Sequence, residues 1–195
     1  MSATGGKLCI GLTGRMASGK GEAVRFLSGC GFRYISLSDI VRSEAAKAGP
    51  RVTRSQMQDI GNRLRREGGA GVLGRIICER VVVAADKRWV IDGIRNPAEV
   101  LELKKTGNFF LIAIDSTMQN IMGRLKQRGR ATDVAAEKEL QSSLEREWGS
   151  GEPEGGQQVG RTMAMADFTV ANDGTLAELQ ARLDEVLKQI GVGHA

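Results

Sequence analysis

A glycine-rich turn between an apolar segment and an amphipathic segment constrains this chain more than any other feature. The turn is GRMASGKG at residues 14–21, and the apolar segment LCIGL at residues 8–12 predicts a buried strand before it. Residues 20–27 predict the start of a helix. A loop of this kind turns its backbone N–H groups inward around a concavity that suits phosphate oxygens. Strand, loop and helix in this order therefore favour a domain that folds around a phosphate group.

The residue types within the loop point to a nucleoside triphosphate. Gly14 and Gly19 allow a tight backbone path, and Lys20 would reach the β- and γ-phosphates as a point charge. The alternative is a glycine-rich turn with a surface lysine, but the flanking strand and helix favour the phosphate loop. Gly21, followed by Glu22, stands where a Ser or Thr usually touches Mg²⁺. We therefore expect Mg²⁺ to be held by waters, by phosphates and by a carboxylate elsewhere.

Composition bounds the class of protein. The chain has 195 residues, of which 41% are hydrophobic, enough for one globular domain with inserted segments. Cys9, Cys30 and Cys78 are far apart and odd in number, which argues against a disulfide framework or a zinc site. The single histidine, His194, excludes Ser-His-Asp and Cys-His catalysis. No signal-peptide pattern or apolar run near eighteen residues is present, so we expect a soluble cytoplasmic protein without a membrane partner.

The charge pattern favours a small anionic ligand over a nucleic acid. The net charge is +5, yet no block of five or six like charges occurs. Two Trp, one Tyr and five Phe are too few for an aromatic platform that stacks single-stranded bases. The sequence therefore argues against a nucleic-acid partner, and it says nothing about the oligomeric state.

The order of predicted elements indicates an α/β fold. We expect strands at residues 7–12, 32–36, 88–92, 109–115 and 167–171. Helical patterns lie at residues 19–29, 38–48, 54–67, 70–85, 96–105, 117–128, 133–148 and 174–190. Strands separated by helices imply βαβ units and a parallel sheet. We expect one domain with its core at about residues 7–190 and two insertions, at about 38–85 and 129–160. Insertions at such places serve as acceptor-binding segments and lids.

The end of the second predicted strand carries a candidate acceptor site. Ser38 could cap the next helix, which would place Asp39 in its first turn and facing the cleft. Arg42, one turn later, would point at a phosphate of the acceptor, because its planar fork binds phosphate oxygens in pairs. If the acceptor is a hydroxyl, Asp39 is the candidate general base. The alternative is a simple capping arrangement without a catalytic role.

The end of the third predicted strand carries a second acidic residue. Asp92 ends the apolar run RWVI at residues 88–91, where it could organise Mg²⁺ through water beside the phosphate loop. Gly93 permits a sharp exit, and Arg95 would follow into the cleft and bind the acceptor. The alternative is a strand-ending turn that happens to hold Asp-Gly.

Arginines around the second insertion are candidates for charge neutralisation. Arg124 and Arg128 are four residues apart and share a helix face, and Arg130 follows them. These cations could cover the transferring phosphate when a lid closes. Arg146 could bind the acceptor from the other arm of the lid, or it could pair with Glu145 or Glu147 nearby. Glycines at residues 149–156 predict a flexible loop.

These motifs, in this order, resemble the adenylate-kinase-like branch of the P-loop nucleotide kinases. Residues 14–21 resemble its G-x-x-G-x-G-K-G loop, with Ala17 in place of the middle glycine. Residues 34–42 and the Val-Ile-Asp-Gly at 90–93 resemble its acceptor-binding and strand-end motifs. The sequence is most similar to adenylate-kinase-related proteins of uncertain function that are common in archaea. The motifs shared with that group stand at Gly19–Glu22, Asp92–Arg95, Arg128–Arg130 and Asn172–Thr175.

The resemblance implies a P-loop NTPase fold with a five-stranded parallel sheet in the order 2-3-1-4-5 and mobile acceptor and lid segments. It implies ATP and Mg²⁺ as cofactors and transfer of the γ-phosphoryl group to a small nucleotide-like acceptor. A nucleoside monophosphate is the first candidate, and dephospho-coenzyme A is the second. The alternative is an ATP-driven switch that binds RNA or a protein. The residues that would hold the nucleotide are Gly14, Arg15, Met16, Ala17, Ser18, Gly19, Lys20, Gly21, Glu22, Arg124 and Asn172.

Overall fold

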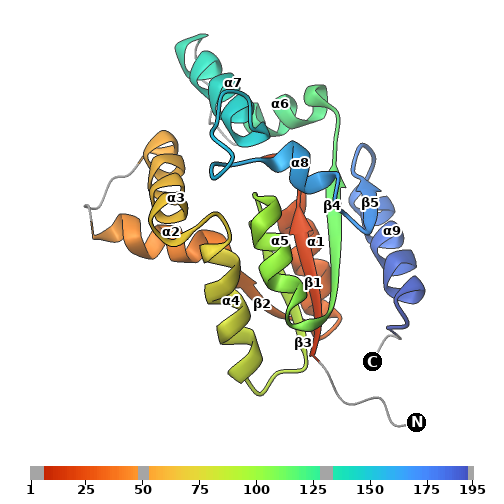
Figure 1. Cartoon of the computed structure of the whole chain (residues 1–195). Coiled ribbons are helices and arrows are strands. Elements are labelled where there is room, and N and C mark those ends of the chain that lie inside the picture. The colour runs from red at the N-terminus through yellow and green to blue at the C-terminus, as the bar shows by residue number, and fades with distance from the viewer. Residues whose placement is uncertain (1–6, 48–52, 128–133, 193–195) are drawn as a thin grey trace.

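Five parallel strands form the centre of the molecule, in the order β2-β3-β1-β4-β5 (Figure 1). The computed structural model describes residues 7–47, 53–127 and 134–192. The strands are β1 (Lys7–Thr13), β2 (Arg33–Ser36), β3 (Arg88–Asp92), β4 (Gly107–Asp115) and β5 (Phe168–Ala171). This is the sheet order that the resemblance implied, and the prediction of the fold class is confirmed.

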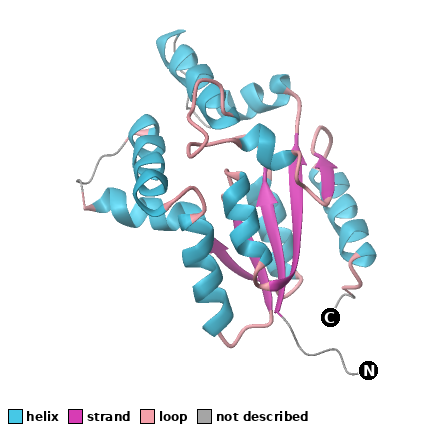
Figure 2. Cartoon of the chain, in the orientation of Figure 1, coloured by secondary structure: helices cyan, strands magenta, loops and turns pink. Residues whose placement is uncertain are grey.

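Helices cover both faces of the sheet, as Figure 2 shows. On one face α1 (Lys20–Gly29) and α9 (Leu176–Gln189) pack against side chains of β1, β3, β4 and β5. On the other face lie α4 (Val72–Val83) and α5 (Pro97–Lys104). Successive strand residues alternate between the faces: Cys9 belongs to the second cluster and Ile10 to the first. Burial on both faces explains why the strands read as continuous apolar runs.

Two groups of helices stand beyond the carboxyl ends of the strands (Figure 1). One group is α2 (Leu37–Ala46) and α3 (Arg54–Gly68), which precede β3 together with α4. The other is α6 (Met118–Gln127) and α7 (Val134–Trp148), which follow β4. The short helix α8 (Val159–Met163) returns the chain to β5. The carboxyl ends of β1 and β3 therefore point toward these two groups of helices.

A buried ion pair fixes the first group of helices to the core. Arg65 of α3 donates from Nε and Nη2 to Glu99 Oε1 of α5, at 2.9 and 2.7 Å. The other oxygen of Glu99 accepts the backbone N–H groups of Arg95 and Asn96. The Arg65 and Glu99 side chains are 2% and 0% exposed. One carboxylate thus ties α3 to the turn that begins α5.

The predicted elements agree with the structure to within two residues at the described ends, and two local predictions differ. Ser36 rather than Ser38 caps α2, because its side chain accepts the N–H of Ser38 at the residue where β2 ends. The helix α8 was not predicted, since five residues are too few to show helical periodicity. No helix within residues 7–47, 53–127 and 134–192 is long and apolar enough to cross a membrane.

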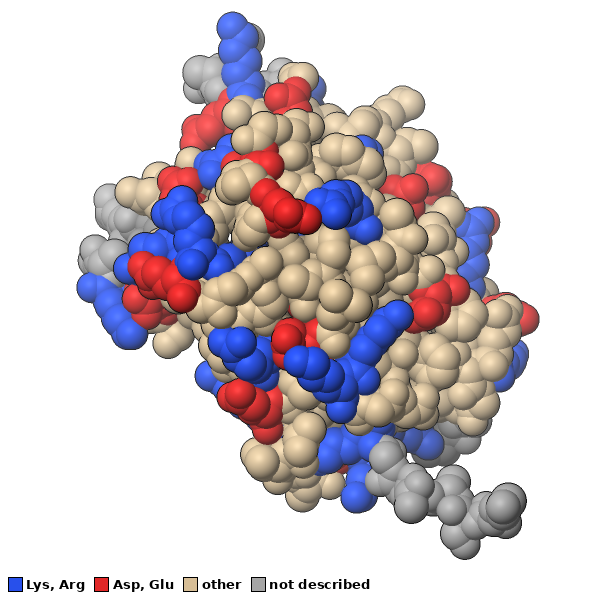
Figure 3. Space-filling model, in the orientation of Figure 1, with Lys and Arg blue, Asp and Glu red and all other residues tan. Residues whose placement is uncertain are grey.

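Basic and acidic side chains alternate over the face of the molecule that Figure 3 shows. Ion pairs at the surface of the molecule, such as Lys47–Glu44 and Lys105–Glu102, also bring opposite charges together. No continuous basic band crosses the described residues on this face. A basic band is the electrostatic mark of a nucleic-acid surface, so this face carries no argument for one.

Candidate active site

The loop between β1 and α1 requires glycine at both ends. Gly14 and Gly19 have φ angles of 135° and 115°. Residues that carry a Cβ are strained in this backbone conformation. A Cβ on Gly14 would lie 2.2 Å from the carbonyl oxygen of Ile114, and one on Gly19 would lie 2.0 Å from Asn172 Nδ2. Ala17, which replaces the middle glycine of the resembled motif, also has a positive φ of 59°. The loop therefore keeps the positive φ of the resembled motif at this position, although the residue there is alanine.

Lys20 lies at the start of α1 and folds back over the loop. Its Nζ donates to the carbonyl oxygens of Gly14 at 2.5 Å and Arg15 at 2.8 Å. Burial lowers the pKa of Lys20, and the carboxylates of Glu147 and Asp92 oppose this shift. The structure thus brings the predicted phosphate-binding lysine close to two carboxylates from distant parts of the chain.

Asp92 stands at the carboxyl end of β3, as predicted. Its Oδ1 is buried and meets no hydrogen-bond partner among the described residues. Such an oxygen fits a water molecule of a hydrated Mg²⁺, which needs only one or two carboxylates when phosphates supply further ligands. The described residues hold no cluster of three His, Cys, Asp or Glu that could bind a metal without a nucleotide. Glu22, which the sequence assigned to the nucleotide site, pairs through both of its oxygens with Arg25 on the same helix.

Arg124 and Asn172 contact the loop through its carbonyl oxygens. Arg124 Nη1 lies 3.2 and 3.3 Å from the oxygens of Ala17 and Ser18, and its Nη2 lies 2.6 Å from that of Asn172. Asn172 Nδ2 donates to the oxygen of Ser18 at 2.7 Å. Both side chains that the sequence assigned to nucleotide binding therefore support the loop. These contacts hold the loop from outside through its carbonyl oxygens. Two of its N–H groups also have protein partners: that of Ser18 donates to the Arg15 carbonyl at 3.2 Å, and that of Met16 donates to the Glu147 carboxylate.

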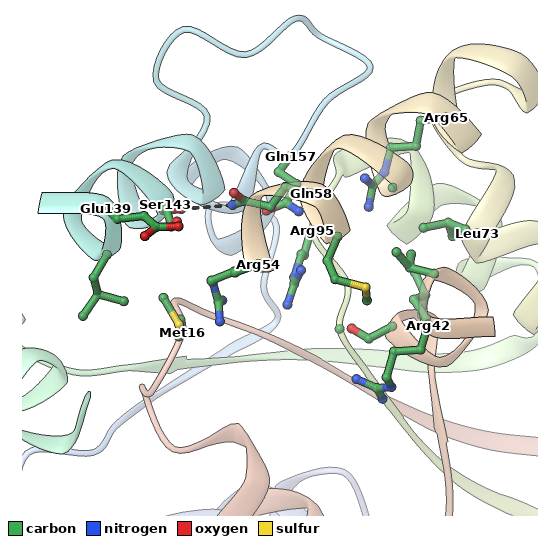
Figure 4. A pocket seen from close by; sticks show the side chains of 17 residues that line it. Met16, Arg42, Arg54, Gln58, Arg65, Leu73, Arg95, Glu139, Ser143 and Gln157 are labelled. Atoms are coloured by element: carbon green, nitrogen blue, oxygen red, sulfur yellow. Dashed lines mark hydrogen bonds between the residues drawn. The ribbon is translucent and has the colours of Figure 1, made fainter. Parts of the chain in front are cut away.

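Next to the loop lies a cavity of about 570 Å³ between α2, α3, α7 and the turn after β3 (Figure 4). Its apolar wall includes Leu37, Val41, Met57 and Leu73. Four arginines also line it, and cations of this kind bind phosphate oxygens: Arg42, Arg54, Arg65 and Arg95.

Two of these arginines were predicted, and two were not. Arg42 and Arg95 lie at the cavity as expected. Arg54 and Arg65 belong to α3, together with Gln58, whose Nε2 donates to the Ser143 carbonyl at 3.0 Å. Residues 54, 58, 61 and 65 share one helix face, so helical spacing alone could have indicated them.

Asp39 lies outside the cavity, contrary to the expectation that it faces the cleft. Its carboxylate accepts from Nε and Nη2 of Arg42, three residues later on α2. The two side chains are 51% and 57% exposed. The pair forms because residues three apart on a helix are neighbours, and it leaves Asp39 on the solvent side.

Arg146 binds α3 rather than the cavity or its neighbours on α7. Its Nε lies 2.7 Å from Glu152 Oε1, and its Nη2 lies 2.8 Å from Asp59 Oδ1. These hydrogen bonds raise the pKa of Arg146. Arg146 therefore fastens α7 to α3, which differs from the acceptor-binding role expected for it. Arg128 and Arg130 fall outside the described residues.

Glu147 is the site residue that sequence reasoning missed. It is fully buried, and its Oε2 accepts the N–H of Met16, a residue of the phosphate loop, at 2.7 Å. Its Oε1 lies 3.5 Å from Arg95 Nε and 4.0 Å from Arg54 Nη2. The sequence analysis named Glu147 only as a possible partner for Arg146. The sequence alone does not show that the end of α7 packs against the loop.

The end of α7 also contacts the loop through apolar and aromatic groups. Met16 packs in a cluster with Leu140 and Leu144 of α7 and with residues of α6. The Arg15 guanidinium lies 3.9 Å from the centroid of the Trp148 ring. The loop that would hold the nucleotide is thus packed directly against the helix that forms one wall of the cavity.

Comparison with known proteins agrees with this geometry. The sequence profile of the AAA domain family matches residues 13–141. A UPF0200 protein of Sulfurisphaera tokodaii is 33% identical over 181 residues, covering 93% of this chain and 96% of its own length. Another, from Methanoregula boonei, is 34% identical over 180 residues, covering 91% and 94%. The chain belongs to the UPF0200 family.

Solved structures show the same fold at low sequence identity. TT1252 from Thermus thermophilus has a TM-score of 0.58 at 17% identity, covering 94% of this chain and 98% of its own. A shikimate kinase from Bacteroides thetaiotaomicron gives 0.56 at 16%, covering 93% and 98%. A gluconokinase from Sinorhizobium meliloti gives 0.53 at 13%, covering 94% and 95%. The predicted kinase-like P-loop fold is confirmed.

Proposed function

We propose that this protein is an ATP-dependent phosphotransferase that moves the γ-phosphoryl group of ATP to a small, phosphate-bearing, nucleotide-like acceptor. The observation that carries the proposal is Met16. It belongs to the phosphate loop and at the same time lines the arginine-rich cavity. A nucleotide on the loop and an anionic molecule in the cavity would therefore be neighbours, which is the arrangement that phosphoryl transfer needs.

The residues divide into three roles in this proposal. The N–H groups of the loop and Lys20 hold the phosphates of ATP. Asp92 would hold Mg²⁺ through its water shell, and the ion would supply charge neutralisation at the phosphates. Arg42, Arg54 and Arg95 bind the phosphate already present on the acceptor and orient it. Catalysis is then mainly positioning and charge neutralisation.

Two acceptor chemistries fit this cavity. A nucleoside monophosphate can offer a phosphate oxygen that is already ionised, and the family resemblance favours it. Dephospho-coenzyme A can offer a hydroxyl, which must lose a proton. Both carry the phosphate that the arginines would bind.

An acceptor screen tests the proposal. Purified protein is incubated with ATP, Mg²⁺ and single candidates, namely the nucleoside monophosphates and dephospho-coenzyme A, and the formation of ADP and of phosphorylated product is followed. We expect saturable turnover with at least one acceptor. Tight binding of RNA in a gel shift, with no product from any acceptor, would instead support an ATP-driven switch.

A further inference from the structure

We propose that Glu147 is the proton acceptor of the transfer and that the group phosphorylated is a hydroxyl. This inference rests on the proposed function and decides between its two acceptor chemistries. It also moves the general-base role from Asp39, which is exposed and paired with Arg42, to a residue that the sequence did not single out.

The position of Glu147 is the first argument. Its Oε2 is occupied by the Met16 N–H of the phosphate loop. Its Oε1 is buried and accepts no hydrogen bond from the residues that the structure describes. Met16, Arg54 and Arg95, which all lie within 4.0 Å of the Glu147 carboxylate, also line the cavity. Glu147 itself is fully buried and does not line the cavity, but its Oε1 lies directly behind Arg95 and Arg54, at 3.5 and 4.0 Å, and both of these arginines do line it. The carboxylate is therefore beside the place where a γ-phosphate and an acceptor would meet.

Other described carboxylates near the cavity suit the role less well. Asp92 also has a buried oxygen without a partner, but it lies at the end of β3, where it fits the water shell of Mg²⁺. Glu139 lines the cavity, but its side chain is exposed to solvent. Glu147 alone among these combines full burial, a bond to the loop and a free acceptor atom.

Charge is the second argument. A phosphate oxygen acting as nucleophile would bring a second anion against the Glu147 carboxylate in a buried site, where like charges repel strongly. A hydroxyl brings no charge and has a proton to give. The cations that face Glu147 are Lys20, Arg54 and Arg95. They can bind the γ-phosphate and the distant phosphate of the acceptor while the hydroxyl faces the carboxylate.

The step balances with ATP as the only co-reactant. The acceptor oxygen forms a bond to the γ-phosphorus as its proton passes to Glu147 Oε1. The bond between the γ-phosphorus and the bridging oxygen breaks, and ADP leaves with the electron pair. Glu147 then releases the proton to water. The products are a phosphate monoester and ADP.

The conservative variant Glu147→Gln separates this role from a purely structural one. Glutamine keeps an oxygen that can accept the Met16 N–H, but it replaces the free acceptor atom with an NH₂ group. Glu145→Gln is the matched control, since Glu145 is an exposed carboxylate two residues earlier on the same helix. Circular dichroism and thermal unfolding would show that both variants fold.

The first measurement is ATP hydrolysis without acceptor, in which water is the attacking hydroxyl. We expect Glu147→Gln to lower kcat about 100-fold or more, the usual contribution of a positioned base, with KM for ATP within about twofold of wild type. Glu145→Gln should match wild type. An unchanged kcat in Glu147→Gln would overturn the proposal, whereas a wild-type protein that neither binds nor hydrolyses ATP would overturn the proposed function itself.

The second measurement locates the new phosphate. Wild type is incubated with ATP and either AMP or dephospho-coenzyme A, and ³¹P NMR distinguishes a monoester on a ribose hydroxyl from a diphosphate. ADP forms from ATP in either case, so we expect one new monoester on the acceptor for each ADP formed, with no acceptor converted to a diphosphate. We expect this monoester to form at least about 100-fold more slowly with Glu147→Gln. Conversion of AMP to ADP by the wild type would contradict the assignment, and so would a monoester formed at equal rates by wild type and variant.

Discussion

At the scale of single residues, the site concentrates opposite charges in a small buried volume. Lys20 contacts two loop carbonyls, and its charged form is disfavoured by burial and favoured by Glu147 and Asp92. Because the three groups come from the loop, β3 and α7, each depends on the fold for its neighbours. Substitutions at these positions should therefore change phosphate chemistry more than they change folding.

Lys20→Ala should abolish most phosphoryl transfer and weaken ATP binding. The lost cation stabilises charge on the transferring group, and its removal should cost about 3–4 kcal/mol of transition-state stabilisation, as for one lost donor at an oxyanion site. Steady-state kinetics and ATP titration measure both effects. Lys87→Ala, at an exposed lysine, is the control. Turnover near wild type in Lys20→Ala would exclude the phosphate-loop assignment.

Asp92→Asn should keep ATP binding but lose most activity, because the shape is retained while the anionic anchor of the Mg²⁺ waters is removed. The rate is measured as a function of Mg²⁺ concentration. We expect the half-saturating Mg²⁺ concentration to rise in the variant. The same dependence in both proteins would show that another group organises the metal.

At the scale of elements, the positions of α3 and α7 decide where the site lies. The Arg65–Glu99 pair holds α3 against α5, and Arg146 holds α7 against α3. The loop at residues 149–158 is tied to the turn that carries Arg95, since Gln158 donates its N–H to the Arg95 carbonyl at 2.7 Å. The helices around the cavity are thus linked to one another through polar contacts.

Arg65→Met should destabilise the protein by about 3–5 kcal/mol, because it leaves the Glu99 carboxylate buried without its cation. Urea unfolding measures the change. Lys105→Met removes the cation of an exposed pair with Glu102 and should change stability little. Similar stabilities for the two variants would mean that the carboxylate of Glu99 finds another partner or water.

At the scale of the whole molecule, the second insertion has two contrasting parts. Gly156, Gln157 and Gln158 are buried, and Asn96 Nδ2 donates to the carbonyls of Glu154 at 2.9 Å and Gly156 at 2.7 Å. Gly151 and Pro153, in the same loop, are exposed. The loop expected to be flexible is therefore anchored at one end, and its exposed part is short.

Limited proteolysis should cut the ligand-free protein in the exposed part of this loop, within residues 149–156, because exposed backbone with small residues is readily cleaved. ATP together with the true acceptor should slow this cleavage, since closure orders a lid over both substrates. Fragment masses locate the cut. Equal rates with and without saturating ligands would mean that the loop is a passive part of the surface.

Much of the fold was predictable from the sequence. The side-chain directions and long-range contacts that form the candidate site were not. Apolar runs and the glycine loop indicated the parallel sheet. Lys20 and Asp92 could be located because each follows a predicted strand, Lys20 through the loop and Asp92 directly. Asp39 was misjudged because a helix position near the site does not fix which way its side chain points. Glu147 was missed because its role arises from contact between segments 131 residues apart. Sequence periodicity predicts local structure, but it does not predict contacts between distant segments.

The two tryptophans of the chain occupy opposite situations. Trp89 is 5% exposed in β3, with its Nε1 donating to the Asp86 carbonyl, while Trp148 is 38% exposed and stacked on Arg15 of the phosphate loop. Intrinsic fluorescence therefore has one emitter inside the sheet and one at the end of α7, in contact with the phosphate loop. A Trp89→Phe protein would report loop occupancy through Trp148, and a Trp148→Phe protein would report unfolding of the sheet, so the chain carries its own pair of optical probes.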